Sequence, residues 1–233
     1  MFVGGEMGKE MLVQYHIQSE KWHKLEIPEE LTSWGKAVDD LVVNDSLLIA
    51  IDNIVLPKYI LFYPLNTTGK LEFSHFRELK YNSSYETTRQ GRISEKYLGL
   101  NSTTMNHGMV YEHFSIYADL DLVRSFAISA EVKRDENFNY QKPNFNDFLL
   151  IEDKLFIGNR EKGLGVFEIK DSYFKKSKDR FDCSNARVSE DKVNYKEYKN
   201  EEIIRLTIIP NETKIILTIR NMRNEIRYEI MDV

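Results

Sequence analysis

Short apolar runs separated by polar turns dominate the chain. Three pairs of runs show this most clearly: LVV and LLIAI at 41–51, LLI and LFI at 149–157, and LTIIP and KIILTI at 206–219. Each pair is joined by a tight polar turn (NDS, EDK and NET), which is typical of a β-hairpin. Helical periodicity is scarce, and the best helical candidate, residues 188–200, has too few apolar positions to anchor a core-facing side. The pattern therefore predicts an all-β protein.

The hairpins repeat along the sequence. Residues 39–49 align with 147–157 without a gap, and FVG at 2–4 aligns with FIG at 156–158. The offsets are near-multiples of about 50 residues, and four short strands in such a unit are typical of a β-propeller blade. A β-sandwich is the alternative, although it need not repeat at a fixed period. We therefore predict one β-propeller domain of about four to five four-stranded blades, with units at about 1–36, 37–94, 95–142, 143–200 and 201–233.

The N-terminal unit carries a more specific pattern. The doublet Gly4-Gly5 stands at a strand end and is followed by Tyr15, six intervening residues and Trp22. This arrangement resembles the kelch repeat of β-propellers. The segment YHIQSEKWHKLEIP is also similar to the propeller modules that follow F-boxes in ubiquitin-ligase adaptors. The resemblance covers residues 1–28 and implies the propeller fold more than a role of those families.

The first and last units have incomplete sets of strands. With strands labelled A to D from the centre of a blade outward, the first unit begins at B, and the last unit has A, B and C but no D. A closed ring completes every blade, often by lending a terminal strand to the other end. In this chain the first unit lacks strand A and the last unit lacks strand D, and a strand D from one end cannot take the place of the missing strand A. We therefore expect an incomplete ring, a part of a larger propeller, or a ring completed by self-association.

Composition and charge narrow the functions to consider. The net charge is −5, acidic and basic residues are interspersed, and the longest basic patch, YFKKSKDR at 173–180, is short. This argues against the clustered positive face that nucleic acid requires. No apolar run approaches the ~20 residues that cross a bilayer, and residues 1–17 lack the features of a signal peptide. We expect a soluble, cytoplasmic protein that binds neither nucleic acid nor membrane.

The glycine-rich stretch GNREKGLG at 158–165 is a candidate phosphate loop. A P-loop requires G-x-x-x-x-G-K-[ST], whereas Gly163 is followed by Leu164 and Gly165. A dinucleotide fingerprint requires a following helix, and none is predicted. Gly158 and Gly163 instead flank a polar loop between two strands, where glycine tolerates positive φ. The stretch therefore predicts a hairpin turn.

Histidine and cysteine provide no convincing site. His107 and His113 form the only pair of histidines considered close enough in sequence to act together. On one strand they would stand ~20 Å apart, which is too far for both to bind one metal ion. The single cysteine, Cys183, excludes an internal disulfide and has no nearby histidine to activate it as a nucleophile. We predict no metal site and no cofactor. Large aromatic residues are expected to fill the space between blades: Trp22, Trp34, Phe73 and Phe76.

Carboxylates at strand ends are the remaining candidates for chemistry. They are Asp39, Asp40, Asp52, Asp119 and Asp121. Paired carboxylates serve as acid and base in glycosidases, whereas carboxylates at turns more often accept hydrogen bonds from the backbone. We expect the backbone role and keep Asp52 and Asp119 as the acid/base pair of an enzyme alternative.

The loops between strands B and C offer a binding surface. In a propeller these loops and the D–A loops emerge on one face, and loops carry function disproportionately. The predicted B–C loops are polar and lie at 5–9, 52–58, 119–121, 159–162 and 221–224. Long D–A insertions at 81–94 and 138–146 would overhang the same side. The predicted contacts with another protein are Lys58, Arg160, Lys162 and Arg223.

The leading prediction is a non-enzymatic module that binds another protein through the loop face of a propeller. The alternative is a propeller enzyme that acts on glycans or a lactone, with Asp52 and Asp119 as acid and base. A third alternative is a fragment without an independent function. An enzyme should gather several ionisable groups with perturbed pKa values around one pocket, whereas a binding module should present a broad polar and aromatic surface.

Overall fold

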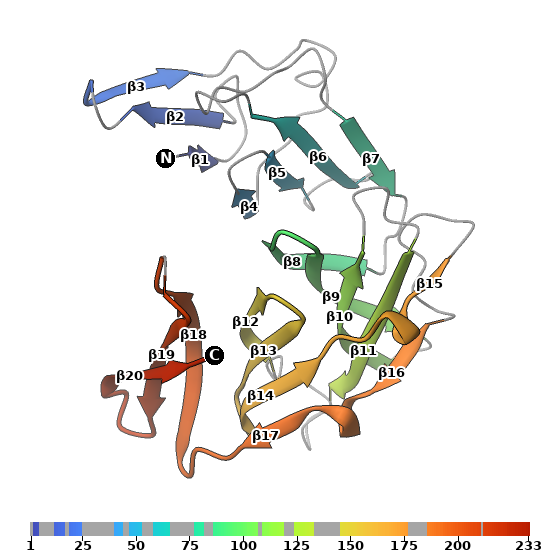
Figure 1. The fold of residues 1–233 in the computed structure, drawn as a ribbon, viewed down its shortest axis with the longest axis vertical. Helices are drawn as coiled ribbons and strands as arrows, with labels where there is room; N and C mark the ends of the chain where they lie inside the picture. Colours follow the sequence, from blue (N-terminus) through green and yellow to red (C-terminus); the bar gives the residue numbers. More distant parts are fainter. Residues whose placement is uncertain are drawn as a thin grey trace. The chain divides into compact units, whose positions relative to one another are not determined.

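The chain is an all-β protein made of several antiparallel sheets (Figure 1). The computed structural model describes residues 2–4, 12–16, 19–24, 40–43, 47–52, 58–65, 77–81, 86–106, 109–118, 124–132, 145–176, 186–210 and 212–233. Within these residues the chain forms β-strands and short 3₁₀ turns but no α-helix. The chain divides into two compact units, residues 1–93 and 94–233. The all-β prediction is therefore confirmed.

In unit 1 (residues 1–93) the described strands form two small antiparallel sheets, and the strand β8 (Glu86–Ile93) also belongs to this unit. The first sheet has the order β1-β2-β3 and comprises β1 (Phe2–Gly4), β2 (Leu12–His16) and β3 (Lys21–Lys24). The second has the order β4-β5-β6-β7 and comprises β4 (Asp40–Val43), β5 (Leu47–Asp52), β6 (Lys58–Pro64) and β7 (Arg77–Tyr81). Strand β8 packs beside β4.

In unit 2 (residues 94–233) the described strands form three sheets that lie face to face (Figure 1). In the first, β9 (Leu98–Asn106), β10 (Met109–Tyr117) and β11 (Arg124–Val132) form a meander, and β11 also pairs with β15 (Lys175–Lys176) and β16 (Arg187–Ser189). The second has the order β12-β13-β14-β17 and comprises β12 (Phe145–Ile151), β13 (Lys154–Asn159), β14 (Gly163–Glu168) and β17 (Asn194–Lys196). The third has the order β18-β19-β20 and comprises β18 (Glu201–Ile208), β19 (Lys214–Asn221) and β20 (Ile226–Asp232).

The second sheet of unit 2 is buried on both faces. Leu155 and Ile157 of β13 pack into a core shared with the β9–β11 sheet, whereas Phe156 between them packs into a core shared with the β18–β20 sheet. Strands that are covered on both sides form nearly continuous apolar runs, which explains the runs FLLI and LFI in the sequence. Strand β19 instead alternates, with Ile215, Leu217 and Ile219 fully buried and the residues between them partly exposed. One of its faces is therefore covered and the other is not.

Buried or half-buried carboxylates join neighbouring strands within each unit through backbone N–H groups. Asp147, which is 3% exposed, accepts one hydrogen bond from Phe148 N (2.8 Å) and another from Leu206 N of β18 (2.9 Å). Asp40 of β4 accepts hydrogen bonds from Leu41 N (3.0 Å) and Gly91 N of β8 (2.7 Å) in the same manner. The expected backbone role of strand-end carboxylates is confirmed for Asp40.

Glu112 forms a similar link between the first two sheets of unit 2. Its fully buried carboxylate accepts a hydrogen bond from Phe145 N of β12 at 3.2 Å. Because buried backbone N–H groups need an acceptor, such links hold one sheet at a defined position against the next. The Asp147 and Glu112 carboxylates therefore connect all three sheets of unit 2.

The predicted hairpins at 41–51, 149–157 and 206–219 are confirmed. The gapless alignment of the first two hides a difference in pairing. Val43 pairs with Leu48 across four intervening residues, whereas Ile151 pairs with Lys154 across two. This shift of two residues keeps each side chain on its face, so it leaves no trace in the hydrophobic pattern.

Three other expectations are corrected. The helical candidate at 188–200 forms a 3₁₀ turn, Glu190–Lys192, between the short strands β16 and β17. The predicted insertion at 81–94 contains β8. The predicted unit 143–200 lends β15 and β16 to the neighbouring sheet at β11. The first of these errors arose because a polar tract has no apolar spacing to distinguish a turn from a helix.

Removal of the Asp147 carboxylate should destabilise unit 2. We expect Asp147→Ala to lower the free energy of unfolding by about 2–3 kcal/mol, because the N–H groups of Phe148 and Leu206 would lose their acceptor away from water. The matched control is Glu168→Ala, since Glu168 is exposed and, among the described residues, forms only a surface ion pair with Lys170. The control should change stability by less than about 0.5 kcal/mol. Urea unfolding midpoints measure both, and equal midpoints for the two variants would contradict this role of Asp147.

A candidate interaction surface at the hairpin turns

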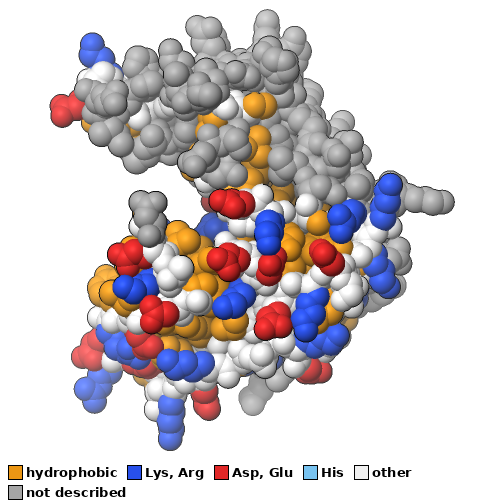
Figure 2. All heavy atoms as spheres, viewed as in Figure 1, with side chains coloured by type: hydrophobic (Ala, Val, Ile, Leu, Met, Phe, Trp, Pro, Cys, Tyr) orange, Lys and Arg blue, Asp and Glu red, His pale blue; other side chains and the backbone are white. Residues whose placement is uncertain are grey.

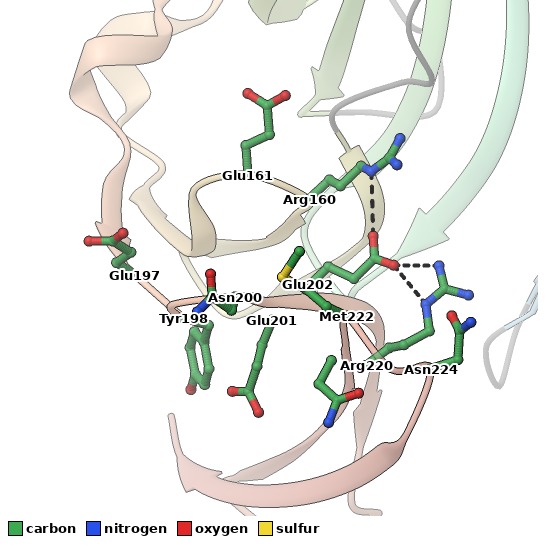
Figure 3. Close-up of a pocket in the computed structure, with 11 residues that line it drawn as sticks. Arg160, Glu161, Glu197, Tyr198, Asn200, Glu201, Glu202, Arg220, Met222 and Asn224 are labelled. Atoms are coloured by element: carbon green, nitrogen blue, oxygen red, sulfur yellow. Dashed lines mark hydrogen bonds and ion pairs between the residues drawn. The ribbon is translucent and has the colours of Figure 1, made fainter.

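An open depression in unit 2 lies where two hairpin turns and one strand connection meet (Figure 3). The turns join β13 to β14 and β19 to β20, and the connection is the segment 197–200 between β17 and β18. The depression has a volume of about 450 Å³. The two hairpin turns lie at the predicted B–C loops 159–162 and 221–224. We refer to the depression and the two turns as the turn surface.

Asn159 shapes the β13–β14 turn. Its side-chain Oδ1 accepts hydrogen bonds from Glu161 N (2.8 Å) and Lys162 N (2.9 Å), which closes the turn from within. Gly163 follows with φ of +86°. A side chain there would also clash with the Lys196 carbonyl oxygen of β17. The prediction of a hairpin turn that uses positive φ at Gly163 is therefore confirmed.

Gly158 has a different function from the one predicted. Among the described glycines, Gly163 has a positive φ and Gly158 does not. A Cβ on Gly158 would lie 3.0 Å from the Ile203 side chain and 3.1 Å from the Ile203 carbonyl oxygen of β18. Glycine is needed here because the backbones of two adjacent sheets approach closely.

Asn221 organises the β19–β20 turn in a similar manner. Its Oδ1 accepts hydrogen bonds from Arg223 N (2.9 Å) and Glu225 N (3.0 Å), and Asn224 adopts the left-handed conformation with φ of 62°. The turn places Met222 outward, where it is 82% exposed at the edge of the depression. An exposed, flexible thioether next to polar groups is a typical element of protein-binding surfaces.

The arginines of the depression are held by one glutamate. Figure 3 shows Glu202 between Arg160 and Arg220. The carboxylate of Glu202 accepts a hydrogen bond from Arg220 Nε at 2.7 Å, and Arg160 Nε lies 3.7 Å from its other oxygen. Both arginine side chains remain about two-fifths exposed. The pairs fix the positions of the two guanidinium groups without burying them.

Beside Glu202, a second ionic cluster crosses the β18–β20 sheet. Arg227 donates hydrogen bonds to Glu201 (2.7 Å) and to Glu229 (3.1 Å), and Tyr198 donates its hydroxyl proton to Glu229 (2.9 Å). The hydrogen bond from Arg227 lowers the pKa of Glu201 and raises that of Arg227. Burial acts to raise the pKa of Glu229, but the hydrogen bonds from Tyr198, Lys196 and Arg227 outweigh it and lower the pKa. Burial is the main cause of the raised pKa of Tyr198.

Two carboxylates on the turn surface have no partner in the described part of the chain. They belong to Glu161 and Glu197, which are both exposed. The depression is lined by four glutamates and two arginines. Because the carboxylates outnumber the guanidinium groups by four to two, the lining carries an excess of negative charge.

The structure brings together some of the predicted contact residues. Arg160 lines the depression, and Arg223 is exposed in the adjacent β19–β20 turn. Lys162 lies in the same turn as Arg160 but is engaged elsewhere: its Nζ donates to Glu190 (2.7 Å) and lies 5.3 Å from the centre of the Tyr195 ring. Lys58 begins β6 in unit 1, where only its backbone is described.

Other candidates fall partly or wholly outside the description. Asp119, His107 and Cys183 lie outside the described residues, and of Asp52 only the backbone at the end of β5 is described. The acid/base pair of Asp52 and Asp119 therefore stays a prediction. Trp34, Phe73 and Phe76 also lie outside the described residues, so their position between blades stays a prediction. Trp22 is 55% exposed and packs against Tyr15 across the β2–β3 hairpin, with ring centres 4.9 Å apart.

The connection between β17 and β18 was not identified from the sequence. It contributes Glu197, Tyr198 and Asn200 to the depression, whereas the sequence placed this segment at the end of a helical candidate. The available signal was Asn200 directly before the segment EEIIRLTII, which is rich in isoleucine and leucine and predicts a strand. Asparagine tolerates the left-handed conformation, and Asn200 adopts it with φ of 61°.

Neither a metal-ion site nor a membrane-spanning helix is found within the described residues. No group of three or more His, Cys, Asp or Glu side chains in this part of the chain is arranged to hold a metal ion. Across the same residues, no helix has the length and apolar character that would be needed to cross a membrane. Burial, followed by the charge of Glu190, raises the pKa of Tyr195 beside the β13–β14 turn.

Comparisons with known proteins give no family assignment. No family model matches the sequence, and no curated protein matches it.

The pH dependence of stability tests the Arg227 cluster. The pKa values of Glu201 and Glu229 are lower in the folded protein than in the unfolded chain. Their contribution to folding stability is therefore fully present above the unfolded pKa of about 4.3. It is lost as the pH falls through the folded pKa values. We expect Arg227→Gln to lower the thermal midpoint at about pH 7 and to have a smaller effect at about pH 3. The control Arg205→Gln, at an exposed position on β18, should have no pH-dependent effect. A constant difference between wild type and Arg227→Gln across this range would contradict the assignment.

Proposed function

We propose that this protein is a non-enzymatic interaction module that binds another protein through the turn surface of unit 2. The observation that carries the proposal is the convergence of two hairpin turns and the 197–200 connection around one open depression. Each turn is closed from within by an asparagine side chain, so the surface is organised before a partner arrives. Pre-organisation reduces the entropy lost on binding.

We also infer that the sheets are blades of a β-propeller with about four to five blades. Three features support this inference: the successive sheets of unit 2 lie face to face, four-stranded sheets follow the chain order of a blade, and carboxylate links recur between neighbouring strands. The kelch-like doublet Gly4-Gly5 and the Tyr15–Trp22 pair support the same fold. In this arrangement the turn surface belongs to the loop face that propellers commonly use for binding.

The chemistry of the surface favours a partner segment with basic side chains. Glu161 and Glu197 present carboxylates that no described residue neutralises, and the amides of Asn200 and Asn224 line the same depression. Met222 adds an apolar contact at the edge. A Lys or Arg side chain followed by an apolar one would match this arrangement of charge and apolar surface.

Selection from a random peptide library with the purified chain tests the proposal. We expect enrichment of peptides in which Lys or Arg lies next to an apolar residue. The double variant Glu161→Gln/Glu197→Gln should weaken binding of a selected peptide by about tenfold, since two exposed charge pairs contribute about 0.4–2 kcal/mol in total. Met222→Asp should also weaken it through the loss of the apolar contact.

The matched control changes the charge at the opposite end of the same sheet. Glu168 ends β14 far along the strand from the β13–β14 turn and is exposed. Glu168→Gln should bind the selected peptide as wild type does. Enrichment without basic residues, or equal losses in the control and the turn-surface variants, would contradict the proposal.

A further inference from the structure

Strand β20 is an edge strand whose outer side is not paired by any strand in the described residues. In the β12-β13-β14-β17 sheet, the corresponding edge of β14 is covered by β17, and in the β4-β5-β6-β7 sheet the edge of β6 is covered by β7. Among the strands that the structure describes, none occupies the fourth position of the β18-β19-β20 sheet. Such an edge is a template for pairing with another chain.

The hydrogen-bonding pattern identifies which residues face that position. In the β19–β20 ladder Asn221 N donates to Glu225 O, and Val233 N donates to Thr213 O. Because inward and outward backbone groups alternate along an antiparallel strand, residues 227, 229 and 231 direct their N–H and C=O groups toward β19. Ile226, Tyr228 and Ile230 direct theirs outward.

The same three residues form an exposed apolar row. Ile226 is 54% exposed, Tyr228 70% and Ile230 62%. The alternate residues Glu229 and Met231 lie on the covered face, where Met231 packs against the core of the β18–β20 sheet. A row of exposed apolar side chains on an unpaired strand edge is normally avoided in proteins that remain monomeric.

We propose that β20 pairs antiparallel with β20 of a second copy of this chain, about a two-fold axis that passes between the two Tyr228 residues. In this register Ile226 lies opposite Ile230 of the second copy, and Tyr228 lies opposite its counterpart. Arg227 lies opposite Glu229 of the second copy, and the two-fold axis repeats this pair. The edge is therefore complementary to itself in charge on one face and in apolar character on the other.

The backbone geometry agrees with this register. A two-fold axis at Tyr228 pairs the outward N–H and C=O groups of Tyr228, Ile226 and Ile230 with equivalent outward groups, as an antiparallel ladder requires. Both three-stranded sheets would then join into one continuous sheet. The interface is isologous, which is the form that closed dimers take.

The neighbouring two-fold registers are disfavoured by charge. An axis at Glu229 would place two Glu229 carboxylates opposite each other, and an axis at Arg227 would do the same with two guanidinium groups. Like charges at directly opposite positions of a ladder destabilise it, whereas opposite charges and aromatic or β-branched pairs contribute favourably. An axis at Ile230 would shorten the paired segment and leave Arg227 and Glu229 without opposite charges.

Sedimentation of the full chain over a range of micromolar concentrations tests the association. We expect a reversible monomer–dimer equilibrium. Tyr228→Lys should raise the dimer dissociation constant by at least about tenfold, because a lysine at the centre of the edge opposes pairing. The control Thr207→Lys adds the same charge to β18 of the same sheet, at an exposed position, and should leave the equilibrium unchanged.

Disulfide formation tests the register. In a Cys183→Ser background, the Tyr228→Cys variant should form an intermolecular disulfide on mild oxidation, because directly opposite Cα atoms in a ladder are about 5.5 Å apart. The Thr207→Cys variant in the same background should stay reduced. Urea unfolding of each variant separates a loss of association from a loss of fold.

Three results would overturn the proposal. The first is a chain that does not self-associate at any concentration, whether or not its β20 strand pairs with a different protein. The second is a dimer that Tyr228→Lys and Thr207→Lys weaken equally, since the contact would then involve the whole face. The third is equal disulfide formation by the Tyr228→Cys and Thr207→Cys variants, which would show that no fixed register exists. The test is independent of the turn surface, because neither position lines the depression.

Discussion

The buried hydrogen bond between the Asp147 carboxylate and Leu206 N is the constraint on which the arrangement of unit 2 depends. Apolar packing between two sheets is not directional and tolerates sliding, whereas a charged acceptor that serves one particular N–H group specifies a single relative position. The Glu112 carboxylate performs the same task for Phe145 N one sheet earlier. In unit 1 the Asp40 carboxylate binds Gly91 N. Hydrophobic cores hold neighbouring strands together, and these carboxylates determine where they meet.

The turn surface depends on the same constraint. Gly158 allows β13 to approach the Ile203 backbone of β18, and Asp147 fixes β12 against Leu206 a short distance along the same strand. As a result, the β13–β14 turn and the β19–β20 turn stand at the same end of adjacent sheets and share one depression. The polar lining is therefore positioned by groups in the core and not by contacts between the turns alone. Arg160 reaches Glu202 across the sheet boundary only because the two sheets are held in this position.

The two surfaces proposed for binding differ in physical character. The turn surface is concave, polar and rich in carboxylates, which suits a charged segment of another protein. The β20 edge offers backbone hydrogen bonds and an apolar row, which suits a strand of the same sequence. Figure 2 shows acidic and basic side chains interspersed over the described part of the face in view. Charge of one sign therefore does not dominate that face, and specific recognition depends on the local arrangement of a few side chains.

The sequence by itself determined the all-β class, the hairpins and the positions of the β13–β14 and β19–β20 turns. These features are local: alternation of side chains, apolar runs and turn residues are encoded within a few neighbouring positions. It also placed Arg160 in the loop between two strands, because charged residues between two apolar runs indicate a turn. Only the tertiary structure showed that β15 and β16 join the neighbouring sheet, that Gly158 is required by Ile203, and that Glu197 faces the same depression as Met222. Each of these depends on contacts between residues that are distant in sequence, and such contacts leave no periodic signal in the chain.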